Sequence, residues 1–102
     1  MKQVQLLFSN NVLLEDARSM KLDYCLTEKT SESDHLTPYY GAKITKYLEG
    51  NVETEEICGI SASKETVISM IKKLYLHEVT PISMVEIVDE LVTDGVSVNS
   101  LA

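Results

Sequence analysis

The feature that most constrains the fold is a proline between two amphipathic helical patterns, in the stretch KLYLHEVTPISMVEIVDELV of residues 73–92. Within a continuous helix, Pro81 would remove a hydrogen bond and clash with the carbonyl four residues earlier, at a cost of about 3 kcal/mol. At the first position of a helix a proline is favourable, and Thr80 before it is a suitable N-cap. The sequence therefore predicts two helices that meet at Pro81.

Apolar residues at the spacing i, i+3, i+4, i+7 mark the buried face of each helix. They are Val67, Met70, Ile71 and Leu74 in the first helix, and Met84, Ile87, Val88 and Leu91 in the second. Ser63 is a suitable N-cap for the first. We expect helices over roughly 64–78 and 81–93, with Gly95 ending the second and a frayed tail over 95–102.

The chain before residue 62 has the patterns of β-strands. Residues 20–27 alternate apolar and polar side chains, which is typical of a half-buried strand. Residues 3–8 place Val4, Leu6 and Phe8 on one side of a similar pattern, and SNN at 9–11 predicts a turn. After that turn we expect either a short strand over 12–15 or a helix over 11–18. The polar segment 28–37 predicts a mobile loop.

Residues 39–60 contain two β-rich runs on either side of Gly-Asn at positions 50–51. This dipeptide favours the positive φ angles that a two-residue hairpin loop requires. With this loop, Ile44 faces Ile57 and Lys46 faces Glu55, so apolar residues meet and opposite charges meet. The pattern predicts a hairpin in this register.

Strands followed by two helices indicate an α+β fold in one domain, residues 1–102. We expect an antiparallel meander of three or four strands, with one face covered by a C-terminal two-helix hairpin. Residues 1–19 add either extra strands or a helix. The sheet side of the core is expected to consist of Leu22, Tyr24, Leu26, Ile44 and Ile57.

The formal charge is −7, and residues 74–102 contain five acidic residues and no lysine or arginine. Such a surface repels phosphate backbones and anionic membranes. Residues 81–93 also lack the Arg, Lys, Asn and Gln side chains that read base edges. We therefore expect neither a nucleic-acid partner nor a membrane partner, whereas a basic partner would suit the acidic end.

The sequence favours a cytoplasmic protein. Its N-terminus lacks the unbroken apolar segment of about 7–15 residues that a signal peptide needs, and no run approaches the length of a membrane span. The two cysteines, Cys25 and Cys58, form no Cys-x-x-Cys pair. Reduced thiols are the expectation for a cytoplasmic location.

No motif predicts catalytic, cofactor-binding or metal-ligating residues. Neither His35 nor His77 has a partner at the spacing of a metal site. Neither cysteine lies in a recognised nucleophile motif, and no glycine-rich phosphate loop is present. The sequence therefore favours a protein without a cofactor.

We expect a non-enzymatic protein–protein interaction or regulatory module, with an unknown protein or a second copy of the chain as partner. The candidate interaction residues are Tyr39, Tyr47, Glu86, Asp89 and Glu90. The alternative is a small-ligand-binding protein or enzyme, with a pocket between sheet and helices near Tyr24, Cys25 or His77. A third class is an acidic mimic of nucleic acid that occupies a basic partner.

The segments YYGAKITKY and VTPI resemble a family of short proteins of unknown function from spore-forming Gram-positive bacteria. The family features fall on Tyr40, Gly41 and Ile44, on Ser63, and on residues 79–82. The resemblance extends over roughly residues 20–92. It implies a bacterial cytosolic origin, and no activity, cofactor or catalytic residue.

Overall fold

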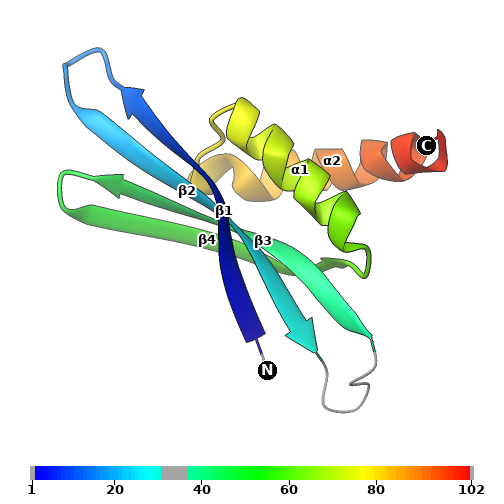
Figure 1. The fold of residues 1–102 in the computed structure, drawn as a ribbon. Helices are drawn as coiled ribbons and strands as arrows, with labels where there is room; N and C mark the ends of the chain where they lie inside the picture. Colours follow the sequence, from blue (N-terminus) through cyan, green and yellow to red (C-terminus); the bar gives the residue numbers. More distant parts are fainter. Residues whose placement is uncertain (1, 31–36, 102) are drawn as a thin grey trace.

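The computed structural model describes the backbone of residues 2–30 and 37–101 and the side chains of residues 2–30 and 37–93. Four strands form an antiparallel sheet in the order β1-β2-β3-β4, and two helices follow (Figure 1). The elements are β1 (Lys2–Leu13), β2 (Ser19–Thr30), β3 (Pro38–Leu48), β4 (Asn51–Ser61), α1 (Lys64–Leu76) and α2 (Pro81–Leu101). The predicted α+β meander is confirmed, with four strands.

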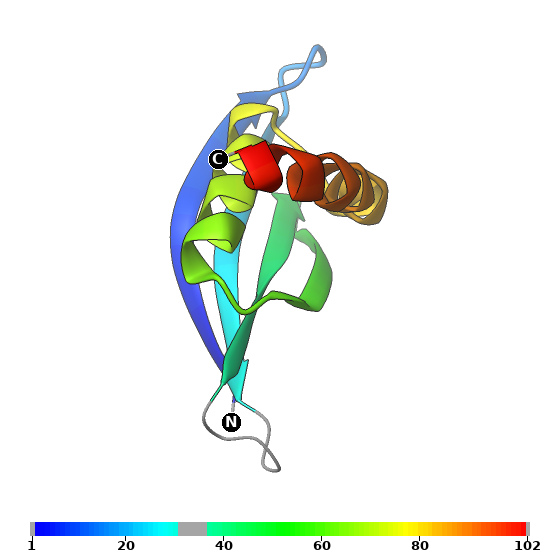
Figure 2. The same ribbon diagram turned by 90° about the vertical axis from the view of Figure 1, so that its right-hand side faces the viewer.

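Both helices lie on one face of the sheet, here called the inner face, and the opposite face is called the outer face (Figure 2). Helix α1 packs across all four strands, whereas α2 packs on β3 and β4. The predicted core residues Leu22, Tyr24, Leu26 and Ile44 are buried, and Ile57 is half-buried against them. The helices contribute Val67, Ile71, Leu74 and Met84 to the same core.

Tyr24 lies at the centre of this core. Its side chain is fully buried, and its hydroxyl donates a hydrogen bond of 2.9 Å to the carbonyl of Val79, in the corner between the helices. Its ring meets the edge of Tyr75 from α1, and Tyr75 stacks on Phe8 from β1 with ring centroids 4.7 Å apart. These contacts join β1, β2, α1 and the helical corner.

The helix boundaries confirm the prediction that Pro81 starts a second helix. The Ser63 hydroxyl accepts a hydrogen bond from the amide of Thr66 and caps α1. The chain turns through residues 77–80, with Glu78 at φ 52°, and α2 then begins at Pro81. Because a proline at this position gives up no helical hydrogen bond, it starts the second helix at no cost.

The predicted turn at residues 9–11 is wrong, and so are the short strand over 12–15 and the alternative helix. Strand β1 instead continues through residues 9–13, and its pairing with β2 shifts at a bulge between Leu6 and Phe8. Asn10, expected in a turn, donates to the carbonyl of Tyr75 at 2.8 Å. The bulge also reverses the side-chain alternation. Phe8 therefore packs on the core, whereas Val4 and Leu6 are exposed, so the three do not share a face.

The predicted hairpin register is also wrong, by two residues. The loop is Glu49-Gly50, with φ angles of 50° and 82°, which a two-residue primed turn requires. Ile44 consequently pairs with Glu55, and Lys46 pairs with Glu53, to which it forms an ion pair of 3.1 Å. A shift of two residues preserves the alternation of side chains, so the predicted inner and outer faces are unchanged.

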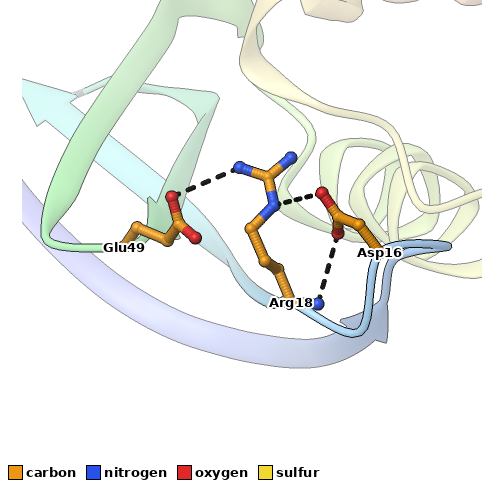
Figure 3. A network of polar contacts seen from close by, with 3 residues as sticks. All are labelled: Asp16, Arg18 and Glu49. Carbon is orange, nitrogen blue, oxygen red and sulfur yellow. Dashed lines mark hydrogen bonds and ion pairs between the residues drawn. The ribbon is translucent and has the colours of Figure 1, made fainter.

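An ion-pair network at the hairpin tips accounts for a glutamate in that turn. Arg18, between β1 and β2, contacts Asp16 at 2.6 Å and Glu49 at 3.3 Å (Figure 3). The amide of Arg18, followed by its guanidinium, lowers the pKa of Asp16. These side chains are about half exposed, so water screens the attraction and the network contributes little to stability.

Two predicted segment ends also differ from the structure. Residues 28–30 belong to β2, and 38 begins β3, so only part of the predicted 28–37 loop connects them; residues 31–36 lie outside the described residues. Helix α2 continues through the predicted stop at Gly95 as far as Leu101, so the predicted frayed tail is largely helical. A glycine costs a helix interior only about 1 kcal/mol, which is too little to end it by itself.

The buried hydroxyl of Tyr24 generates a test. Tyr24→Phe leaves the Val79 carbonyl without its donor and should lower the free energy of unfolding at pH 7 by about 1–3 kcal/mol. Tyr47→Phe, at an exposed ring on the outer face, is the matched control and should change it by less than about 0.5 kcal/mol. Urea denaturation followed by circular dichroism measures both.

The stability difference between wild type and Tyr24→Phe should also depend on pH. Burial raises the pKa of Tyr24 to about 12, above the value of about 10 in an unfolded chain. The stability from the neutral hydroxyl is therefore fully present below pH 10 and is lost as the pH rises through 12. The difference between wild type and Tyr24→Phe should shrink above pH 10. A difference that stays constant there would contradict this assignment.

Candidate interaction groove

An open groove of about 430 Å³ lies between the end of β4 and the first half of α2. Its walls are mostly apolar, with two carboxylates from the helix among them. The lining residues are Ile57, Cys58, Gly59 and Ile60 from β4, and Val85, Glu86, Val88, Asp89 and Val92 from α2. We call this feature the β4–α2 groove.

Helix α2 forms one wall because it carries two apolar stripes. Met84 and Val88 point into the core and are almost completely buried. A second stripe at spacing i, i+3, i+10 consists of Ile82, Val85 and Val92, which are 88%, 55% and 37% exposed. Since the sheet ends at β4, no further strand lies beneath this second stripe. The groove is therefore the place where the helix extends past the edge of the sheet.

A bulge in β4 shapes the other wall. Tyr40 pairs with Ser61, and Ala42 pairs with Ile57. Between these two pairs the chain advances four residues along β4 but only two along β3. Gly59 takes a φ of 66°, which favours glycine. The bulged backbone lies directly on Gly41, where an added Cβ would collide with the Ile57 carbonyl and lie 2.9 Å from the Cys58 Cα. Gly41 thus permits the bulge that places residues 57–60 in the groove.

The surroundings of the groove are acidic. Glu86 and Asp89 line it, and Glu90 is exposed on the same helix. Strand β4 carries three further glutamates, of which Glu53 and Glu55 alternate to the inner face and Glu56 to the outer face. Two of these are paired within the chain, Glu53 with Lys46 and Glu56 with Lys2. The groove therefore combines an apolar floor with a negative rim.

The structure separates the residues predicted to form an interaction surface. Glu86 and Asp89 meet in the groove, with Glu90 beside them on α2. Tyr39 and Tyr47 are exposed as expected, and they follow the outward alternation of β3, away from the helices. The sequence reasoning missed Val85, Val92 and Ile60. The second apolar stripe of α2 was the available signal for the two valines.

The outer face holds a polar cluster around Glu56. Lys2 of β1 contacts its carboxylate at 2.6 Å, and the Cys58 thiol donates to it at 3.1 Å. Because β1 and β4 are opposite edges, the Lys2 contact requires the sheet to coil at this end. Burial would raise the pKa of Glu56, but the hydrogen bonds from Lys2 and Cys58 and the nearby lysines outweigh it and lower that pKa.

The surroundings of both thiols raise their pKa values. The hydrogen bond to the Glu56 carboxylate, together with burial, raises the pKa of Cys58. Burial, followed by the charge of Asp23, raises the pKa of Cys25. Since the thiolate is the reactive form, these shifts disfavour covalent catalysis by either residue.

The three residues predicted to border a pocket, Tyr24, Cys25 and His77, lie apart from one another and outside the lining of the β4–α2 groove. Tyr24 fills the core, Cys25 alternates to the outer face, and His77 caps the end of α1. Among the described side chains, no group of three His, Cys, Asp or Glu could hold a metal ion. Within the described part of the chain, no helix is both long and apolar enough to cross a bilayer.

A comparison with protein-family models matches residues 3–94 to a family described as "Family of unknown function (DUF6514)". The match spans nearly all of the sheet, α1 and the part of α2 that lines the groove. The expected likeness to a family of unknown function is confirmed, and its expected bacterial source stays a prediction. Neither the curated proteins nor the solved structures gave a match.

The contact at Gly41 predicts the cost of filling it. Gly41→Ala should destabilise the protein by about 1–3 kcal/mol, because main-chain atoms of β4 must move. Gly50→Asn is the control, since nothing lies near that position and asparagine tolerates its left-handed φ. It should cost less than about 1 kcal/mol in urea denaturation. Equal stability of the two variants would show that the bulge does not depend on Gly41.

The hydrogen bond to Cys58 predicts its reactivity. In a Cys25→Ser background, Glu56→Gln should lower the pKa of Cys58 and speed its alkylation by iodoacetamide at pH 7.5 by about three- to tenfold. Glu53→Gln, on the same strand but pointing to the other face, should leave the rate unchanged. Intact-mass spectrometry over time gives the rates. A rate unaffected by Glu56→Gln would contradict the assigned cause.

Proposed function

The chain belongs to the DUF6514 family of unknown function, and we propose that it is a non-enzymatic protein–protein interaction module. Its docking surface is the β4–α2 groove. The observation that carries this proposal is an exposed apolar stripe on α2 beside an unpaired sheet edge, with carboxylates around it. Exposed apolar surface rimmed by polar groups is characteristic of interaction sites.

The shape of the groove favours a macromolecular partner over a small ligand. Its volume falls within the range of about 300–1,000 Å³ of small-molecule sites. Such sites, however, enclose their ligand and direct several convergent polar groups at it. Here the groove is open along the sheet edge, and its charged side chains are Glu86 and Asp89. An apolar segment anchored between two carboxylates fits this better than an enclosed metabolite does.

The proposal includes a setting in the bacterial cytoplasm. The resemblance of YYGAKITKY and VTPI to proteins of spore-forming Gram-positive bacteria supports it. So do the thiols of Cys25 and Cys58, which are free. An interaction module requires no catalytic residues, and no motif in the sequence predicts any.

The test is selection of binding peptides from a random twelve-residue display library on the immobilised chain. Val85→Asp places a charge in the groove, and Val52→Asp is its matched control, at an exposed valine on the outward side of β4. Selected peptides should bind the parent with micromolar Kd. Val85→Asp should weaken them at least about tenfold, or 1.4 kcal/mol, and Val52→Asp less than about twofold.

Melting temperatures of both variants establish that they fold. Peptides that bind equally well to the Val85→Asp variant, or a library that yields no binder, would overturn the groove as docking surface. Stabilisation of the parent by a small metabolite in a thermal-shift screen, abolished by Val85→Asp, would instead favour the small-ligand alternative.

A further inference from the structure

We propose that the partner is an extended segment of alternating aliphatic and basic residues, which adds to the free edge of β4 as a fifth strand. This inference rests on the proposed function and deepens it, because it specifies the chemistry and the conformation of the occupant.

The outer edge of β4 is available for pairing with another strand. Strand β4 is 11 residues long and pairs with β3 alone among the described strands. The hydrogen bonds described outside the sheet ladders involve no main-chain group of residues 51–61. An edge of this length is a template for another strand unless something covers it. No element of the described chain lies along it.

Helix α2 is positioned to cover one side of an added strand. A strand added to β4 would lie about 4.8 Å beyond it, and a helix with its side chains is about 10 Å wide. Helix α2 covers β3 and β4 with Met84 and Val88, while Val85 and Val92 face the groove at the edge. Where a fifth strand lies beside Ile57, its alternate side chains would enter the groove and cover these valines. Helix α2 would therefore cover the inner side of such a strand.

The negative charge near this edge favours a basic partner over a second copy of the chain. Two copies joined through their β4 edges would bring together the glutamates at 53, 55 and 56 of both chains, and like charges opposite one another destabilise a strand pair. With aliphatic side chains in the groove, the alternate lysines or arginines would lie on the outer side of the added strand, beside Glu56. The carboxylates of Glu53, Glu55, Glu86 and Asp89 on the groove side would attract these cations at longer range. The acidic surroundings would also speed the encounter.

The other edge of the sheet is less suited to this role. Strand β1 is interrupted by the bulge between Leu6 and Phe8, and a bulge hinders addition of a strand. Before its own bulge, β4 makes seven consecutive regular pairs with β3, from Asn51 to Ile57, whereas β1 makes at most six with β2, so β4 offers the longer straight edge.

The experiment uses four nine-residue peptides, acetylated and amidated, at 150 mM salt. The first alternates lysine and valine, beginning and ending with lysine. The second and third have the same sequence with N-methyl groups on the odd-numbered or on the even-numbered residues, which block strand pairing and keep the charge. The fourth replaces each lysine with glutamate. Calorimetry measures affinity, and amide hydrogen exchange of the full chain locates the site.

The lysine–valine peptide should bind with micromolar Kd and slow exchange of β4 edge amides at least tenfold. The N-methylated and glutamate peptides should each bind at least tenfold more weakly, and Val85→Asp should weaken the first peptide at least tenfold while Val52→Asp does not. For N-methylation, both registers of substitution are tested, so that at least one register blocks the edge-facing amides.

Equal binding of the lysine–valine peptide and both N-methylated forms would overturn strand addition. If that binding still depended on Val85, the groove would stand as the docking surface. Failure of the lysine–valine peptide, when library peptides bind in a Val85-dependent way, would overturn this inference alone. Absence of any Val85-dependent binding would overturn both. A dimer of the free chain with protected β4 amides, by sedimentation and exchange, would overturn the basic partner in favour of a second copy.

Discussion

The buried hydrogen bond between the Tyr24 hydroxyl and the Val79 carbonyl is the contact on which the rest of the structure depends. It joins the middle of the sheet to the corner between the helices, where a main-chain carbonyl would otherwise lie unpaired in an apolar environment. Since Pro81 begins α2 two residues later, fixing the corner also fixes where α2 starts. The stacked rings of Phe8 and Tyr75 support the same region from β1 and α1.

The surface properties follow from that placement. Helix α1 lies over the whole width of the sheet, so α2 is left with β3 and β4 and reaches the edge. A helix at an edge can bury one stripe against the sheet and leaves a neighbouring stripe exposed. In α2 that neighbouring stripe is apolar, and a bulge permitted by Gly41 brings residues 57–60 up to it. In Figure 1 the C-terminal end of α2 continues away from the strands.

Much of the fold was predictable because it depends on periodicity. Alternation in β2 correctly placed Leu22, Tyr24 and Leu26 in the core, and a repeat of 3.6 residues correctly chose the buried faces of both helices. The candidate site was only half predictable. Glu86 and Asp89, which were chosen for their charge, line the groove, but their separation from Tyr39 and Tyr47 depends on the side of the sheet that each residue occupies. Charge and aromaticity contain no such information.

By itself the sequence determined two helices that meet at Pro81, a strand-rich first half and an acidic second half, because proline geometry, side-chain period and formal charge are local properties. Only the tertiary structure decided the register at Glu49-Gly50, the bulges in β1 and β4, and the helix that extends past the sheet edge. These features depend on which strand lies beside which, and on contacts such as Asn10 with Tyr75 that join residues far apart in the chain. Local preferences differ too little in energy to select among such arrangements, and the packed core selects one of them.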